Sequence, residues 1–281
     1  MVASRDISGA TRLAGVIGWP VSHSRSPRMH NAAYEALGMD WVFVALAVPP
    51  PRLAEALRGL PALGFAGVNV TIPHKQAVAA LCDELAPRAA RAGSVNTVTV
   101  REDGSLYGDT TDGEGMLDAV GPLRGRGALV LGAGGAARAA VAALLDAGFE
   151  VAVCARREDA ARGLVDGLGG RAAPWPPRSA AALVVNATPV GQSGDATELP
   201  IEPSLLRFAE VVCDLAYRGD GVETGLVATA RRSGVRAVDG LDVLVGQGAR
   251  SFRIFTGVAP PIDVMRAAVR IDGGVDTTLR G

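Results

Sequence analysis

The feature that most constrains the fold of this chain is a glycine-rich turn between an apolar strand and an alanine-rich helix. Residues 128–131 form the expected strand, 132–135 the turn and 136–147 the helix, which ends at Gly148. A GxGxxG/A pattern in this setting is typical of a dinucleotide-binding unit, because free N–H groups and the helix dipole favour a pyrophosphate at the helix N-terminus. The alternative is an ordinary turn in a chain with 36 glycines. We predict cofactor contacts from the turn at Gly132, Ala133, Gly134, Gly135 and Ala136.

The end of the next strand indicates which dinucleotide is bound. The expected strand 150–155 runs directly into Arg156 and Arg157. An acidic residue here binds the ribose 2′-hydroxyl of NAD, whereas guanidinium groups suit the 2′-phosphate of NADP through charge-assisted hydrogen bonds. We therefore predict NADP, bound by Arg156 and Arg157. Glu158 follows directly, so NAD remains an alternative cofactor. The other interpretation is that these charged residues are simply exposed to solvent and bind no cofactor.

Strands and helices alternate along the rest of the chain. Before the turn we expect strands at 13–18, 41–47 and 67–70, helices at 27–37 and 51–60, and a hairpin of 95–100 with 106–108. After it we expect strands at 182–185, 211–215 and 235–237, a proline-rich loop at 171–177, and helices at 241–257 and 261–270. This alternation predicts an α/β fold with largely parallel sheets. We expect two domains, one of residues 1–111 plus 240–281 and one of residues 112–239.

Composition excludes several other classes of protein. A chain of 281 residues that is 48% hydrophobic is not disordered, and a net charge of −1 gives no reason to expect nucleic acid or an anionic membrane as partner. No apolar run approaches the ~20 residues that span a bilayer. The three cysteines are far apart and form no CxxC motif, which is typical of a reducing cytoplasm and not of a zinc site. We therefore expect a cytoplasmic protein with no metal.

One residue is conspicuous by its rarity. All 28 basic residues are arginine except Lys75, and asparagine is almost as scarce, with Asn69, Asn96 and Asn186 among the four present. A bias towards arginine accounts for most of this pattern. A lysine that remains under such a bias is predicted to do what a guanidinium cannot, such as exchange a proton near neutral pH.

Four short polar motifs stand at the ends of expected elements. They are SHSRSP at 22–27, NVTIPHK at 69–75, SVNTV at 94–98 and GDTTDG at 108–113. Each alone is equally compatible with helix capping or turn formation. Together they supply hydroxyls, amides, one ammonium and one carboxylate, a set that suits a small polyhydroxylated acid. A lysine beside an aspartate would serve proton transfer coupled to hydride transfer.

These motifs, with GAGGAAR at 132–138, VVNATPVG at 184–191 and DGLDVLVGQGA at 239–249, resemble the shikimate dehydrogenase family in order and spacing over about residues 13–270. The resemblance implies two domains flanking a cleft, an α/β substrate domain of residues 1–111 plus 240–281 and a Rossmann NADP-binding domain of residues 112–239. It implies reversible NADPH-dependent reduction of 3-dehydroshikimate to shikimate in chorismate and aromatic amino-acid synthesis. It implies that Lys75, paired with Asp112, donates and accepts the proton. It implies substrate contacts from Ser24, Ser26, Asn69, Thr71, Asn96, Tyr217 and Gln247. It places Asn186, Ala187 and Thr188 beside the cofactor.

Some positions depart from the family pattern and leave alternatives open. Ala155-Arg156-Arg157 replaces the family's Asn-Arg-Thr, and the arrangement of two arginines followed by an acid, Arg156-Arg157-Glu158, is similar to the dual-specificity quinate/shikimate branch, which can use NAD. Serine at both 24 and 26 favours shikimate over quinate. A non-catalytic metabolite sensor would not need Lys75 with Asp112, and a polyol dehydrogenase would carry a Tyr-xxx-Lys arrangement that is absent here. We expect small-molecule ligands, no nucleic-acid or membrane partner, and a monomer or homodimer.

Overall fold

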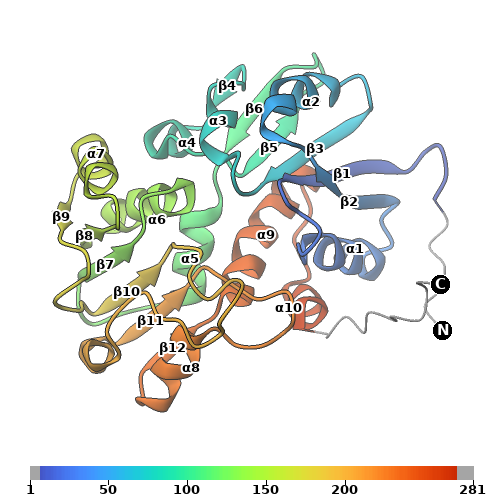
Figure 1. Ribbon diagram of the computed structural model, residues 1–281. Helices are drawn as coiled ribbons and strands as arrows, with labels where there is room; N and C mark the ends of the chain where they lie inside the picture. Colours follow the sequence, from blue (N-terminus) through green and yellow to red (C-terminus); the bar gives the residue numbers. More distant parts are fainter. Residues whose placement is uncertain (1–6, 271–281) are drawn as a thin grey trace.

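The computed structural model describes residues 7–270, which form two six-stranded sheets with helices packed around them (Figure 1). None of the helices in this part of the chain is long and apolar enough to cross a membrane.

The first sheet is built from the N-terminal part of the chain. Its strands are β1 (Arg12–Gly18), β2 (Trp41–Ala47), β3 (Phe65–Val70), β4 (Glu84–Leu85), β5 (Thr97–Val100) and β6 (Leu106–Asp109), in the order β2-β1-β3-β5-β6-β4. The strand β1 is parallel to β2 and β3, whereas β5 is antiparallel to β3 and β6. The predicted hairpin is therefore confirmed. Its helical elements are α1 (Ser26–Ala36), η1 (Pro50–Arg52), α2 (Leu53–Gly59), α3 (Lys75–Ala79) and α4 (Pro87–Ala92).

The second sheet is entirely parallel. Its strands are β7 (Gly127–Leu131), β8 (Glu150–Cys154), β9 (Arg171–Ala173), β10 (Leu183–Asn186), β11 (Val211–Asp214) and β12 (Arg236–Val238). The order β12-β11-β10-β7-β8-β9 is that of a Rossmann fold. Its helical elements are α6 (Gly135–Asp146), α7 (Glu158–Leu168), η2 (Pro203–Phe208) and α8 (Gly225–Arg232).

The prediction of a loop over 171–177 was wrong for its first three residues. Arg171–Ala173 pairs in parallel with Ala152–Cys154 as the edge strand β9. The side chains of this edge strand are largely exposed, so its sequence shows no apolar pattern. It is a strand because it pairs with β8, which the sequence does not reveal.

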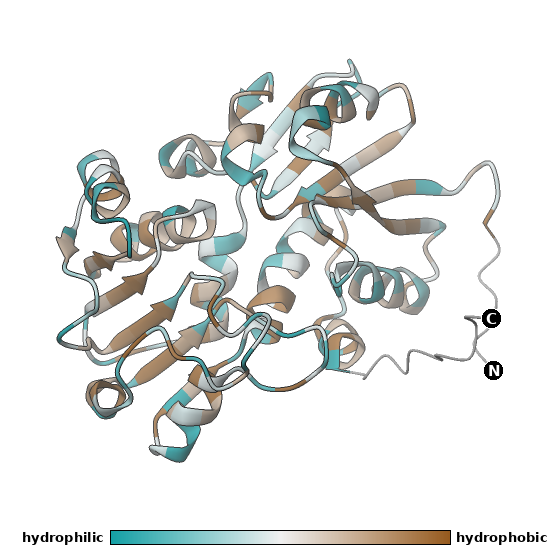
Figure 2. Ribbon diagram, viewed as in Figure 1, coloured by the Kyte–Doolittle hydropathy of each residue, from teal (hydrophilic) through white to brown (hydrophobic). Residues whose placement is uncertain are grey.

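The core of the second sheet follows from its apolar strands, which are brown in Figure 2. Strands in a parallel sheet are covered on both faces and need continuous apolar runs. Val184 and Val185 are neighbours in β10 and face opposite sides, and each is fully buried in a different apolar cluster. This packing fixes the carboxyl ends of the strands, from which the loops predicted to bind a nucleotide leave.

Three further helices complete the chain, α5 (Asp112–Val120), α9 (Gly240–Thr256) and α10 (Ile262–Arg270). The helices α5 and α9 lie between the two sheets (Figure 1). They cross so closely that a Cβ atom added at Gly115 would lie 2.3 Å from the backbone nitrogen of Gln247. This close crossing fixes Asp112, at the start of α5, relative to Gln247 on α9. The predicted domain boundaries, at 111/112 and 239/240, stay a prediction.

Candidate active site

A cavity of about 890 Å³ opens between the carboxyl ends of the strands of both sheets. Most of the predicted site residues line it. From the substrate side these are Ser24, Ser26, Asn69, Thr71, Lys75, Asp112, Tyr217 and Gln247. From the nucleotide side they are Gly132, Ala133, Gly134, Gly135, Ala136, Arg156, Arg157, Ala187 and Thr188. Asn96 and Asn186 are not among the lining residues.

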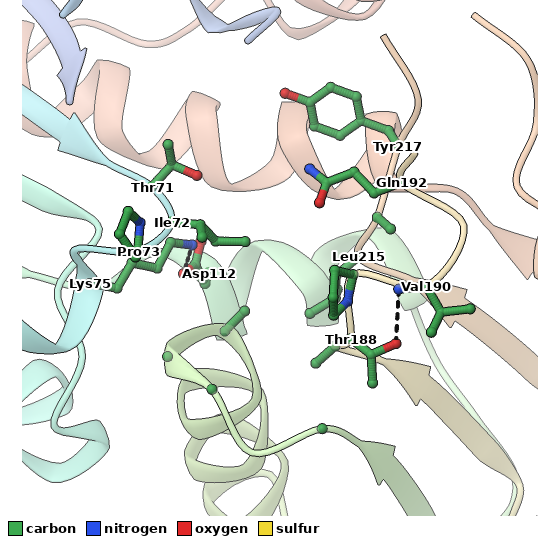
Figure 3. Close-up of a pocket in the computed structure, with 18 of the residues that line it drawn as sticks. Thr71, Ile72, Pro73, Lys75, Asp112, Thr188, Val190, Gln192, Leu215 and Tyr217 are labelled. Atoms are coloured by element: carbon green, nitrogen blue, oxygen red, sulfur yellow. Dashed lines mark hydrogen bonds and ion pairs between the residues drawn. The ribbon is translucent and has the colours of Figure 1, made fainter. Parts of the chain in front are cut away.

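An ion pair forms part of the wall of this cavity. Lys75 Nζ donates a hydrogen bond of 2.6 Å to Asp112 Oδ2, and about one-seventh of each side chain is exposed. Lys75 is the first residue of α3 and Asp112 the first of α5. Figure 3 shows the pair on one side of the pocket, with Gln192, Leu215 and Tyr217 on the other. A positioned amine therefore faces the space that a ligand would occupy.

Asn96 supports the ion pair by a hydrogen bond to Asp112. Its Nδ2 donates to Asp112 Oδ1 at 2.8 Å and to Gln247 Oε1 at 3.1 Å. Its Oδ1 accepts from the backbone N–H of Thr111 at 2.8 Å. Asn96 is 1% exposed and its amide bonds to protein groups, so it supports Asp112 and Gln247. Its predicted contact with substrate stays a prediction.

Asn69 and Thr71 follow one another along the end of β3. Asn69 Nδ2 donates to the backbone oxygen of Asn96 and to Thr97 Oγ1, at 3.1 and 3.2 Å. Ser251 donates to Asn69 Oδ1 at 3.3 Å. These bonds orient the Asn69 amide at the cavity wall. Thr71 lies one residue beyond the strand and is drawn in Figure 3 near Lys75.

Hydroxyl groups gather at the opposite end of the substrate side. The backbone N–H of Ser26 donates to Ser24 Oγ at 3.3 Å, so Ser24 shapes the turn that begins α1. Burial raises the pKa of Tyr217, although hydrogen bonding to the Arg25 backbone and to the Ser24 side chain partly opposes this rise. The phenol therefore stays protonated at neutral pH and remains a hydrogen-bond donor. The Arg25 guanidinium donates to the backbone oxygens of Gly219 and Val269, which holds the segment after Tyr217 in place.

The glycine turn has the geometry that the sequence predicts. Gly132 has φ of +109°, in the left-handed region that favours glycine, and a Cβ atom there would lie 2.8 Å from the carbonyl oxygen of Ala187. The helix α6 starts at Gly135, one residue earlier than predicted, and Gly134 offers no side-chain cap. A Cβ atom at Gly134 would meet nothing within 4 Å, so the backbone is open to a ligand. The residues present therefore fit a pyrophosphate.

The turn and the ion pair adjoin each other. A Cβ atom at Gly135 would lie only 2.9 Å from the Cβ atom of Lys75. The N-terminus of α6 is thus packed against the start of α3.

Two guanidinium groups mark the far end of the nucleotide side. Arg156 and Arg157 are exposed and line the cavity, and among residues 7–270 neither forms an ion pair. Glu158 begins α7 and forms an ion pair of 2.8 Å with Arg162, one helical turn away. The Glu158 carboxylate, which made NAD an alternative cofactor, is therefore paired with Arg162 and does not line the cavity. Arg156 and Arg157 remain available to bind a phosphate.

Comparisons with known proteins agree with this geometry. Residues 16–98 match the family model described as the shikimate dehydrogenase substrate binding domain, and residues 240–270 match the shikimate 5′-dehydrogenase C-terminal domain. The NADP(+) shikimate dehydrogenase of Rubrobacter xylanophilus is 48% identical over 95% of this chain and 98% of its own. That of Anaeromyxobacter dehalogenans is 48% identical over 95% of this chain and 99% of its own.

The chain belongs to the shikimate dehydrogenase family.

Solved structures of the family support the same assignment. The Thermus thermophilus shikimate 5-dehydrogenase in complex with NADP(H) and shikimate has a TM-score of 0.85 at 40% identity, covering 92% of this chain and 99% of that one. A quinate dehydrogenase from Corynebacterium glutamicum in complex with NAD has a TM-score of 0.80 at 30% identity, covering 92% and 98%. The predicted family and α/β fold are confirmed.

In this member of the shikimate dehydrogenase family, Asn186 holds the loop beside the glycine turn. It is fully buried, and its Oδ1 accepts from the backbone N–H and hydroxyl of Thr188, at 3.0 and 2.6 Å. Its Nδ2 donates to Asp214 Oδ1 at 2.8 Å. Asn186 bonds to protein groups and positions Thr188, which lines the cavity, and its predicted place beside the cofactor stays a prediction.

Asp214 was missed by the sequence analysis. It is fully buried at the end of β11, where its Oδ2 accepts from the Thr224 hydroxyl at 2.6 Å. Burial raises its pKa to about 6, although hydrogen bonds from Thr224, Ala216 and Asn186 oppose this rise. A charged residue at the end of an apolar strand was the one available signal. Gln192 on the same side also lines the cavity and carried no signal in sequence.

Proposed function

We propose that this protein catalyses the reversible NADPH-dependent reduction of 3-dehydroshikimate to shikimate, a step in chorismate and aromatic amino-acid synthesis. The observation that carries the proposal is the ion pair of Lys75 and Asp112, set in a cavity against the glycine turn at Gly135. Relatives with 48% identity are NADP(+) shikimate dehydrogenases. The Thermus thermophilus structure holds both NADP(H) and shikimate.

The residues of the nucleotide side fit NADP. The backbone N–H groups of the glycine turn and of the first turn of α6 would bind the pyrophosphate. Arg156 and Arg157 would bind the 2′-phosphate through charge-assisted hydrogen bonds. Ala187 and Thr188, held by Asn186, would border the nicotinamide half. When bound, the cofactor supplies a hydride to the carbonyl carbon of the substrate.

The chain's own residues handle the charge and the proton. As the carbonyl is reduced, negative charge develops on its oxygen, and the Lys75 ammonium stabilises and protonates that oxygen. Asp112 holds the ammonium in place through Oδ2 and is itself held through Oδ1 by Asn96. In the oxidation of shikimate, Lys75 accepts the hydroxyl proton.

Substrate recognition divides between two groups of polar residues. Hydroxyls of Ser24, Ser26 and Tyr217 would bind the carboxylate, since they converge around the start of α1 and Tyr217 remains a donor. Asn69, Thr71 and Gln247 would bind the ring hydroxyls from the other end. Such convergent donors select a polyhydroxylated acid, because an analogue lacking a hydroxyl leaves a buried polar group unpaired.

The test is an oxidation assay that offers shikimate and quinate separately, each with NADP⁺ and with NAD⁺. We expect the highest kcat/KM for shikimate with NADP⁺. A preference for quinate with NAD⁺ would support the second reading of a catabolic quinate/shikimate dehydrogenase. Tight binding of shikimate and NADP⁺ without turnover would instead indicate a metabolite sensor and contradict the proposal.

We also propose a cellular compartment and an oligomeric state for the enzyme. We place it in the cytoplasm, which the free thiols of Cys82, Cys154 and Cys213 support, because disulfides are rare in that compartment. We propose that it acts as a monomer or a homodimer, which sedimentation at assay concentrations would distinguish.

A further inference from the structure

A proline-rich segment of the nucleotide side has no part in the function proposed above. Pro174, Trp175, Pro176 and Pro177 follow directly after β9. Of the three tryptophans in the sequence, this one lies in the Rossmann part of the chain. Trp41 is buried against the first sheet, and Trp19 is 47% exposed near Ile72.

Sheet register brings Trp175 to the arginine end of the cavity. The strands β8 and β9 are parallel, and Cys154 is the register partner of Ala173. Arg156 and Trp175 each lie two residues beyond this pair, at the carboxyl ends of the adjacent strands β8 and β9. Both residues line the cavity, together with Ala160.

The indole is held in place from behind. Trp175 is half-buried and packs against the apolar cluster that includes Leu131, Cys154 and Val184, beside Leu199. The Cys154 thiol donates to the backbone oxygen of Pro174 at 2.8 Å, which ties the segment to the end of β8. Because proline fixes φ, the prolines on both sides of Trp175 restrict the backbone before any ligand arrives.

The chemistry of this corner suits a planar base linked to a phosphate. An indole face stacks on a purine, and a neighbouring guanidinium adds cation–π attraction and a bond to phosphate. A small residue such as Ala160 leaves room beside them. The exposed arginines on their own would bind phosphate in any compound, whereas an aromatic wall adds selectivity for a base.

We infer that Trp175 is the adenine platform of the cofactor site, stacking the base while Arg156 and Arg157 bind the attached 2′-phosphate. This inference rests on the proposed use of NADP. It assigns to the tryptophan a binding role that is separate from the chemistry at Lys75. Trp175 therefore determines affinity for the adenosine half of the cofactor.

The experiment measures binding of adenosine 2′-monophosphate and of NADP⁺ by calorimetry, and the tryptophan fluorescence change that accompanies binding. We expect Trp175→Ala to weaken both ligands by about 5- to 100-fold while shikimate binding is unchanged. Trp175→Phe retains an aromatic face, so its affinity should stay near that of the wild type while the fluorescence change disappears. Trp19→Phe is the matched control and should keep both the affinity and the signal.

Each outcome decides between the two proposals. Unchanged affinity in Trp175→Ala, or a fluorescence change that persists in Trp175→Phe, would overturn the platform. Circular dichroism checks that Trp175→Ala is folded. If its spectrum is altered, the test uses Trp175→Phe alone, in which the fluorescence change on ligand binding should be lost. A wild-type protein that binds neither ligand contradicts both proposals, whereas one that binds them as expected but does not oxidise shikimate contradicts only the proposed function.

Discussion

Asn96 Nδ2 lies 2.8 Å from Asp112 Oδ1, so the carboxylate that holds Lys75 is itself held by a buried amide. The same nitrogen reaches Gln247, and the amide oxygen accepts from Thr111. One side chain that is almost fully enclosed thus positions two residues of the cavity wall. The orientation of Asp112 depends on Asn96 as much as on the helix that carries it.

Asn96→Asp tests this support. The variant keeps the acceptor for Thr111 but places a second carboxylate against Asp112, which turns an attraction into a repulsion. We expect kcat/KM to fall by about 10- to 100-fold, corresponding to the loss of one charge-assisted hydrogen bond. Steady-state kinetics with shikimate and NADP⁺ measure the effect. Wild-type kinetics in a correctly folded variant would show that Asp112 needs no support from Asn96.

Lys75→Met tests the proton-transfer role. Methionine retains an unbranched side chain as far as the ε-carbon and removes the amine, so the developing charge on the substrate oxygen loses its stabilising group. We expect kcat to fall by about 10²–10⁴-fold with little change in KM, as general acid–base groups contribute that much. A large rise in KM at unchanged kcat would make Lys75 a binding residue only.

Arg156→Ala and Arg157→Ala test the choice of cofactor. Each removes a guanidinium that among the described residues has no competing ion pair, and a hydrogen bond to a charged group contributes about 1.5–3 kcal/mol. We expect KM for NADP⁺ to rise by about 10- to 100-fold in at least one variant, while KM for NAD⁺ changes little. Glu158→Gln is the control, because its carboxylate is engaged by Arg162, and it should leave the preference intact. A clear loss of NAD⁺ activity in that control would show that Glu158 binds the cofactor ribose and would contradict the assignment.

The sequence predicted what depends on local pattern and missed what depends on packing. The glycine turn was predictable because strand, turn and helix are contiguous, and Lys75 stood out because arginine replaces lysine everywhere else. The strand β9 could not be predicted, since its three residues show no alternation of apolar and polar side chains. The supporting contacts of Asn96 and the burial of Asp214 could not be predicted for one reason. Whether a polar residue at a strand end turns towards the cavity or the core depends on neighbours far away in sequence.

His30 should make the fold sensitive to acid. It is fully buried, stacks on Phe43 with ring centroids 4.2 Å apart, and both its ring nitrogens lack hydrogen-bond partners within residues 7–270. Burial lowers its pKa to about 3. The unfolded chain takes up a proton below about 6.5 and the folded one does not, so this contribution to stability is present above pH 6.5 and lost as pH falls.

The measurement is the free energy of unfolding in urea at pH 7 and pH 5. Protonation of His30 in the unfolded chain should lower the free energy of unfolding by about 2 kcal/mol between pH 7 and pH 5. The interval extends 1.5 pH units below 6.5, and each pH unit corresponds to about 1.36 kcal/mol. His30→Leu should remove that part of the pH dependence. His23→Gln alters an exposed histidine and should retain it. Equal pH dependence in His30→Leu and the wild type would contradict a neutral, buried imidazole.

Asp214 should act on stability in the opposite direction. Its folded-state pKa of about 6 exceeds the value of about 3.9 for an unfolded aspartate, so the folded state binds the proton more tightly. The corresponding stability is complete below pH 4 and is lost as pH rises through 6, by about 3 kcal/mol in total. Asp214→Asn carries no charge and keeps an oxygen acceptor for Asn186, so its unfolding free energy should lack this decline. Asp214→Ala should instead lose about 1–3 kcal/mol for each buried donor left unpaired and should bind NADP⁺ more weakly, because Asn186 no longer fixes Thr188. Urea unfolding from pH 4 to pH 7, with calorimetry of NADP⁺ binding, separates the two effects, and a decline that persists in Asp214→Asn would assign the titration to another group.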